Sequence, residues 1–274
     1  MKAPRTPEDV DWSALLRNAK VVDLDALRKM KEAHRRLFTF NGPPAIASFV
    51  RLFRLVNLFG FFAMRDKRFP VLNRAWADLQ WIARHPEVSE FAVAGWVLLD
   101  LPVTEEGRTV AELFVEEIAP DNADARAFAE ITRKSRYGVY EDVGGTRQSH
   151  RLQELVTRRK VTVTRGVGGD PGELYWTRII EWGGMAFMLG DTRGWPADRR
   201  RQVEEMIIDR VGLSPWMTAK TSVADAYEPF MKMTGPYWFS VLYAHSDDDP
   251  VLEPDHYLSY RSGPVPDLLD PRRW

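Results

Sequence analysis

Apolar residues recur at helical spacing through the first half of the chain. Apolar side chains three and four residues apart are typical of helices that bury one face. Stop signals such as Asn41-Gly42-Pro43-Pro44 separate these segments, because glycine frees the backbone and proline cannot continue the helical hydrogen bonds. The pattern predicts helices over residues 22–39, 45–64, 70–85, 88–100, 109–118 and 122–134.

The spacing shortens near Ser135, where β-branched and aromatic residues become frequent. Val161 and Val163 alternate with polar residues, which is the pattern of a half-buried strand. Gly183-Gly184 lies between two apolar runs and indicates a hairpin turn. We expect strands over residues 137–143, 160–165, 174–182 and 185–189. Four or five short strands at this spacing predict a small antiparallel β-barrel or a curled sheet over about 137–190.

Helical spacing returns at Pro196, where proline suits the first turn of a helix. The chain is therefore expected to be an α+β protein with a helical N-terminal half and a helical C-terminal extension. We divide it into a helical region (1–134), a small β module (135–195) and a helix followed by an aromatic, proline-rich extension (196–274). With 274 residues, these regions are expected to form one compact unit. The aromatic end of the chain, up to Trp274, favours docking over disorder.

Composition excludes several kinds of chemistry. There is no cysteine, which excludes disulfides, zinc fingers, iron–sulfur clusters and thiolate nucleophiles. The 38 basic and 39 acidic residues nearly cancel, so attraction to nucleic acid must come from a local patch. The first residues lack the apolar run of a secretory signal, and we expect a cytoplasmic protein. No cofactor is expected.

The most apolar stretch, residues 45–64, is long enough to cross a bilayer. However, Arg51 and Arg54 lie near its centre, and each costs about 2.5–3.5 kcal/mol on insertion. An integral membrane protein is therefore disfavoured, and a core helix is the preferred interpretation. Peripheral contact through 45–64 is the membrane alternative, because basic residues from 28 onward precede several phenylalanines there.

The middle of the chain contains, in order, FAVAGWVLLDLPV, GRTVAELFVEE, SRYGVYEDV, LQELVTRRKVTV and ELYWTRIIEWGGMAFMLG. Over residues 90–195 this order resembles a module of uncharacterised bacterial proteins, some of which carry a SEC-C zinc motif at one end. The resemblance implies a helix ending in an aspartate, then a G-R-T helix and a short barrel, but no activity. SEC-C zinc binding needs cysteines, which are absent here. The matching residues are Trp96, Asp100, Gly107, Arg108, Thr109, Glu112, Ser135, Arg136, Tyr140, Leu155 and Arg178.

Sequence motifs of the common hydrolases and phosphate-binding loops do not occur. HExxH, GxSxG and GxxxxGK[ST] are all absent from the sequence. The segment HSDDDPVLEPDH offers imidazole and carboxylate ligands that suit a divalent cation. A metal-dependent hydrolase using this segment, His245 to His256, is our alternative to a binding protein. Its candidate ligands are His245, Asp247, Asp249 and His256.

A basic patch within the β module is the strongest interaction signal. Aromatic residues such as Tyr137, Tyr140, Tyr175 and Trp176 are interleaved with it. Phosphate contacts combined with base stacking would hold a single-stranded nucleic acid. The alternative is that the aromatic side chains fill the module and the charges are solvated. The candidate binding residues are Arg136, Arg147, Arg151, Arg158, Arg159, Lys160 and Arg165.

Asp100 follows an apolar run and is expected to be partly buried, so it needs a partner. Arg108 is the nearest candidate, in a structural salt bridge at a helix end. Together these observations lean away from an enzyme. They predict a non-catalytic binding or adaptor protein whose partner, a protein or a nucleic acid, contacts the basic β module.

Overall fold

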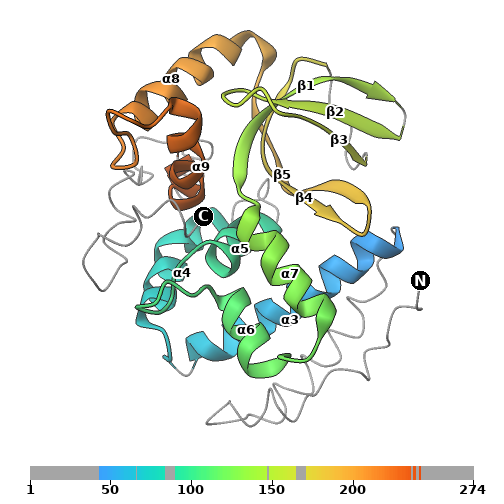
Figure 1. Cartoon of the computed structure of the whole chain (residues 1–274), viewed down its shortest axis with the longest axis vertical. Helices are drawn as coiled ribbons and strands as arrows, with labels where there is room; N and C mark the ends of the chain where they lie inside the picture. The colour runs from blue at the N-terminus through green and yellow to red at the C-terminus, as the bar shows by residue number, and fades with distance from the viewer. Residues whose placement is uncertain are drawn as a thin grey trace.

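The computed structural model describes residues 43–65, 67–83, 90–146, 148–164, 171–235, 237–238 and 241. Within these residues, five helices precede a sheet of five strands, and further helices follow it (Figure 1). The first helices are α3 (Pro44–Arg65), α4 (Pro70–Ala83), α5 (Glu90–Leu99), α6 (Val110–Ile118) and α7 (Ala123–Lys134). The strands are β1 (Tyr137–Thr146), β2 (Ser149–Glu154), β3 (Lys160–Thr164), β4 (Leu174–Trp182) and β5 (Met185–Trp195). The short η2 (Ala197–Arg199), α8 (Arg200–Gly212) and α9 (Val223–Met233) complete the described fold.

Local hydrogen bonds fix where the helices begin. Thr109 and Glu112 form a capping box at α6, and the Asn122 side chain accepts a hydrogen bond at the start of α7. The helices predicted over 45–64, 70–85, 88–100, 109–118 and 122–134 are found close to these bounds. The helix predicted over 22–39 lies outside the described residues. Helix α9 was not predicted; it begins with a capping box at Ser222 and Asp225 and contains Pro229.

The sheet is antiparallel and open, with strand order β3-β2-β1-β4-β5. The predicted barrel or curled sheet is therefore wrong, because β3 and β5 are the two edges and no backbone ladder joins them in the described part of the chain. Strand β2, which was not predicted, completes the central ladder. Gly183 and Gly184 form the expected hairpin turn between β4 and β5, both with positive φ.

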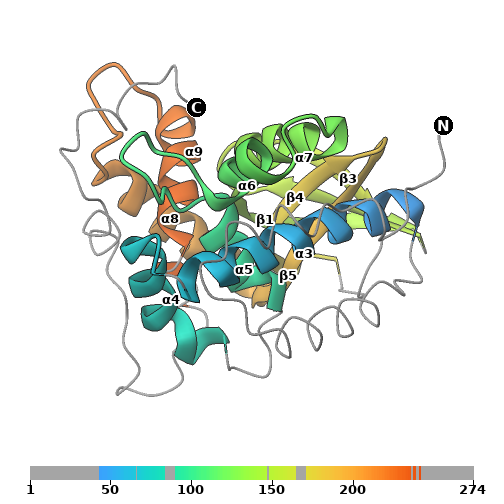
Figure 2. The ribbon, with the colours of Figure 1, turned by 90° about the horizontal axis from the view of Figure 1, so that it is seen from below.

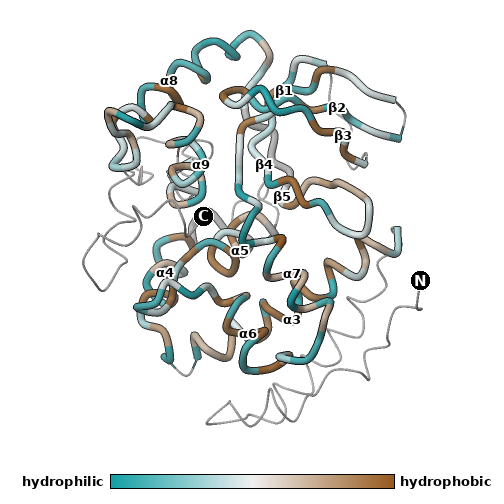
Figure 3. Tube along the Cα trace, viewed as in Figure 1, coloured by the Kyte–Doolittle hydropathy of each residue, from teal (hydrophilic) through white to brown (hydrophobic). Residues whose placement is uncertain are grey.

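The two faces of the sheet have different surroundings. Its helix-covered face contributes side chains such as Tyr137, Trp176, Ile180 and Phe187 to one large core shared with α3, α5, α7 and α9. Hydrophobic segments of the trace fall both in these helices and in the sheet (Figure 3). The opposite face, which we call the pocket face, carries a separate small cluster made by Tyr140, Leu152, Val163 and Tyr175.

Helix α3 is the one described helix that is long and apolar enough to cross a membrane. It crosses β4 and β5, which it contacts (Figure 2). Phe49, Phe53 and Val56 of α3 are almost fully buried in the large core. The aromatic ring of Phe49 contacts those of Phe128, Trp182 and Phe187. The apolar surface of α3 is thus used for packing within the protein.

Candidate functional site

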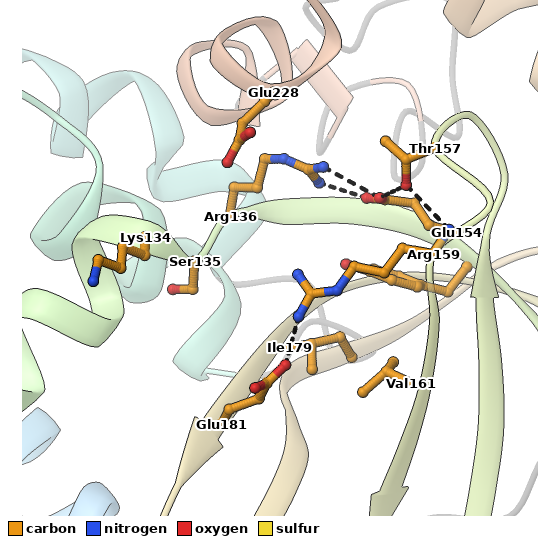
Figure 4. A pocket seen from close by; sticks show the side chains of 11 residues that line it. Lys134, Ser135, Arg136, Glu154, Thr157, Arg159, Val161, Ile179, Glu181 and Glu228 are labelled. Atoms are coloured by element: carbon orange, nitrogen blue, oxygen red, sulfur yellow. Dashed lines mark hydrogen bonds and ion pairs between the residues drawn. The ribbon is translucent and has the colours of Figure 1, made fainter. Parts of the chain in front are cut away.

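A pocket of about 200 Å³ opens on the pocket face of the sheet, beside the end of α7 and the exposed side of α9 (Figure 4). Its lining combines an apolar floor with a rim that carries charges of both signs. This combination is common in binding sites, where apolar contact supplies affinity and a few polar groups fix the orientation of the ligand. The lining residues are Lys134, Ser135, Arg136, Tyr140, Glu154, Thr157, Arg159, Val161, Ile179, Glu181 and Glu228.

The side chains of the pocket floor are positioned by the strands, in which successive side chains point to opposite faces of the sheet. Tyr140 on β1, Val161 on β3 and Ile179 on β4 all point to the pocket face. Val161 and Ile179 are only partly buried, whereas Tyr140 is 6% exposed. Burial raises the pKa of Tyr140 well above its ordinary value, and Glu154 adds to this effect. The Tyr140 hydroxyl therefore stays protonated at neutral pH.

Glu154, at the end of β2, organises one wall of the pocket. Its carboxylate accepts two hydrogen bonds from Arg136, at 2.5 and 3.2 Å, and one from the hydroxyl of Thr157. The guanidinium of Arg136 also lies 4.7 Å from the centre of the Tyr227 ring. Desolvation disfavours the charge of Arg136, but the hydrogen bond and charge of Glu154 outweigh it and raise the pKa of Arg136. This wall is an ion pair that these hydrogen bonds hold in place.

The opposite side of the pocket holds an exposed ion pair. Arg159 donates a hydrogen bond to Glu181 at 2.5 Å, and their side chains are 66% and 60% exposed. In Figure 4 the Arg159 side chain passes above Val161 and Ile179 to reach Glu181. An exposed pair of this kind is worth about 0–1 kcal/mol, so a ligand can displace it at little cost.

The other residues of the predicted basic patch do not gather in one place. Arg158 pairs with Glu204 of α8. Arg151 and Lys160 are exposed, and within the described residues no hydrogen bond or ion pair is found for their side chains. Arg147 and Arg165 lie outside the described residues. The structure therefore brings together Arg136 and Arg159 at the pocket and places the other described members elsewhere.

The aromatic residues of the predicted patch are buried. Tyr137 and Trp176 are fully buried and stack on each other with ring centres 4.1 Å apart, and Tyr140 and Tyr175 are 6% and 4% exposed. Base stacking requires an exposed ring face. These four rings fill the protein, which was the alternative expected from the sequence.

Asp100 is buried, as expected, but its partner is not Arg108. Its carboxylate accepts a hydrogen bond from the fully buried Arg178 of β4, and the ammonium of Lys232 on α9 lies 3.7 Å away. Arg108 instead pairs with Glu116 at the surface. Burial raises the pKa of Asp100 against the opposing charges of Arg178 and Lys232, and burial also lowers the pKa of Lys232.

One further buried pair was missed from the sequence. His150 Nδ1 lies 2.7 Å from Asp142 Oδ2 across the β1–β2 hairpin, and His150 Nε2 has no hydrogen-bond partner among the described residues. Only the eight-residue separation within one hairpin could have suggested this pair. The predicted metal segment with His245, Asp247, Asp249 and His256 lies outside the described residues. Within them, no group of three or more metal-binding side chains is found.

Comparison with known proteins finds no matching family model, no matching curated protein and no matching solved structure. The fold and the pocket are therefore interpreted from their own geometry. They define an α+β protein with an open antiparallel sheet, helices on one face and a small charged pocket on the other.

Proposed function

We propose that this chain is a non-catalytic binding or adaptor protein that holds a protein partner at the pocket of its β module. The observation that carries the proposal is the pocket itself, where Val161 and Ile179 form an apolar floor under a rim of paired charges. Such a floor accepts an apolar stem, and the rim selects the polar group that accompanies it.

The groups around the pocket are suited to binding more than to catalysis. Glu154 is neutralised by Arg136, and its hydrogen bonds to Arg136 and Thr157 hold it in place. A general base needs a free lone pair aimed at substrate and a pKa near the working pH. Tyr140 has its pKa raised away from that range.

A protein partner is favoured over a single-stranded nucleic acid by the surroundings of the basic and aromatic side chains. Arg136, Arg158 and Arg159 each pair with a glutamate, which reduces the positive charge offered to phosphates. The aromatic rings that would stack on bases are buried. A surface with apolar and paired ionic groups matches the contacts that proteins exchange with each other.

The test is affinity purification of the tagged full-length chain from the cells that naturally contain it, with identification of cross-linked proteins. Val161→Asp places a charge on the pocket floor and should abolish recovery of the specific partner. Thr162→Asp is the matched control, because the adjacent residue lies on the other side of the same strand and is exposed. We expect this control to recover the partner as well as the unchanged chain does.

Two results would overturn the proposal. One is recovery of the partner that is unaffected by Val161→Asp. The other is nuclease-sensitive material in place of a protein, together with binding of a labelled single strand that falls steeply with salt and with Arg158→Ala plus Arg159→Ala. Circular dichroism of both aspartate variants verifies that each is folded.

A further inference from the structure

One carboxylate at the pocket is not paired with any of the cations that line it. Every cation in the lining has a carboxylate partner: Lys134 pairs with Glu130 at 2.7 Å, Arg136 with Glu154 and Arg159 with Glu181. The third lining carboxylate, Glu228 of α9, has no side-chain hydrogen bond or salt bridge among the described residues, and the cation on which its charge acts is Lys232, which is buried and does not line the pocket. The lining, which the sequence predicts to be basic, therefore holds three cations and three carboxylates, and Glu228 is the carboxylate that is not paired with a lining cation.

Glu228 and Glu181 lie on different sides of the same opening. Glu228 projects from α9 at the rim next to Arg136, while Glu181 projects from β4 beyond the tip of Arg159 (Figure 4). Val161 and Ile179 lie in the floor near Arg159. Negative groups at the rim and apolar groups at the floor match a side chain with an aliphatic stem and a positive end.

We infer that the pocket accepts a primary ammonium or guanidinium group on an aliphatic stem, the chemistry of a lysine or arginine side chain. The stem lies on Val161 and Ile179, and the cation lies within reach of Glu228 and of the exposed carboxylate of Glu181. The inference rests on the proposed binding function and specifies what the pocket selects.

The size of the pocket agrees with this ligand class. Its volume of about 200 Å³ corresponds to roughly seven water molecules at about 30 Å³ each. That is enough for one long side chain and is below the usual range for drug-sized ligands or nucleotides. An anionic group of the same size would be repelled by the carboxylate of Glu228. It would also have to compete with Glu181 for the guanidinium of Arg159.

The direct test is an NMR titration of the full-length chain with three blocked amino acids. The probes are Nα-acetyl-lysine amide, the neutral Nα-acetyl-norleucine amide with a matching stem, and the anionic Nα-acetyl-glutamate amide. We expect the lysine compound to shift the amide signals of Val161 and Ile179 and to bind most tightly of the three. The difference in affinity between the lysine and norleucine compounds should shrink as salt is added, because salt screens the exposed ionic contact of the ammonium group.

A pair of variants separates the pocket from general surface charge. Glu228→Gln should weaken lysine binding about two- to fivefold, the effect of one exposed ionic contact. Glu205→Gln removes the same charge from α8, where Glu205 pairs with Arg201 and does not line the pocket, and should leave binding unchanged. Equal binding of lysine and norleucine compounds, tighter binding of the glutamate compound, or equal effects of the two variants would overturn the inference.

A further arm distinguishes the source of the cation. Tighter binding of the blocked lysine than of free 1,5-diaminopentane indicates a side chain of a protein, and the reverse order indicates a small free amine; both orders support a cation pocket. Failure of the inference is also separable from failure of the proposed function. If Val161→Asp abolishes partner recovery but the lysine and norleucine compounds bind equally, the partner site stands and the cation assignment is wrong.

Discussion

Three buried charges join three separate parts of the chain. Asp100 follows α5, Arg178 lies on β4 and Lys232 lies on α9. The ammonium of Lys232 also donates a hydrogen bond to the backbone carbonyl of Arg133, and the guanidinium of Arg178 lies 4.9 Å from the ring centre of Tyr137. Buried ions are costly to desolvate, so the group is stable only while each charge keeps its counterpart.

Replacement of Asp100 by asparagine should destabilise the protein strongly. The change removes the buried negative charge that Arg178 and Lys232 share, and removal of one member of a buried pair costs about 3–5 kcal/mol. Urea unfolding measures the loss. Glu116→Gln, which breaks an exposed pair with Arg108, is the control and should cost no more than about 1 kcal/mol. Similar losses for the two variants would show that the buried group contributes little.

Lys232 should make stability depend on pH in the alkaline range. Burial lowers the pKa of Lys232 from its ordinary value of 10.5, with Arg178 adding to the effect and Asp100 opposing it. Between the lowered pKa and 10.5 the folded protein binds fewer protons than the unfolded chain, so the free energy of unfolding due to Lys232 rises with pH.

The measurement for Lys232 compares urea unfolding of the unchanged chain and Lys232→Met from about pH 7 to 10. The methionine variant lacks this proton equilibrium. The difference in unfolding free energy, unchanged chain minus variant, should therefore increase with pH. Parallel curves would mean that Lys232 titrates alike in the folded and unfolded chain.

At the scale of elements, α5 and β5 pack so closely that their contact requires glycine. Gly190 has a φ of +68°, and a Cβ atom built there would lie 2.8 Å from the Cα of Ala92. The same helix is held by the hydroxyl of Tyr137, which donates a hydrogen bond of 2.7 Å to the Ala92 carbonyl. This contact places the helix over one end of the sheet.

Gly190→Ala should therefore destabilise the protein more than Gly184→Ala. Both residues have positive φ, for which alanine costs about 1–2 kcal/mol, but a Cβ at Gly184 meets no atom within 4 Å. Overpacking against Ala92 should add about 1–3 kcal/mol at Gly190. Thermal unfolding of both variants measures the difference. Equal midpoints would show that α5 can move away from β5 without cost.

The elements that sequence reasoning found are those with local signals. Helix α6 follows from apolar spacing after Thr109, and the β4–β5 turn follows from Gly183-Gly184. Strand β2 was missed because Ser149–Glu154 is mostly polar, and α9 was missed because Pro229 argues against a helix. In each missed element the buried face is created by packing against other parts of the chain.

The candidate site was predictable only in part, because its ion pairs depend on strand order. Arg136 and Arg159 stand out as basic residues in the sequence, but their partners are 18 and 22 residues away. The partner of Asp100 is 78 residues away on β4. The expected partner, Arg108, was chosen by proximity along the chain. A basic patch predicted from the sequence is therefore less positive in the folded protein wherever carboxylates from other strands pair with its residues.

At the scale of the whole molecule, the β module and the helices share a single large core. The helix-covered face of the sheet buries Tyr137, Trp176, Ile180 and Phe187 against the helices before and after the sheet. The pocket face offers only the four-residue cluster around Tyr140 as a core of its own. The pocket is therefore held by a sheet that the helices stabilise.

The isolated segment 135–195 should consequently fail to fold, although it contains all five strands. Without the helices it would expose the large aromatic and aliphatic side chains of the covered face, and a core in a segment of roughly 60 residues rarely supplies more than about 3–5 kcal/mol. Far-ultraviolet circular dichroism and tryptophan emission of the segment, compared with the full chain, measure this. We expect an unfolded spectrum and solvent-exposed emission from the tryptophans of the segment, of which Trp176 and Trp182 are buried in the complete protein. Cooperative unfolding of the segment with buried tryptophan emission would instead mean that the pocket face and its edges suffice to hold the sheet, and that the pocket belongs to an independent module.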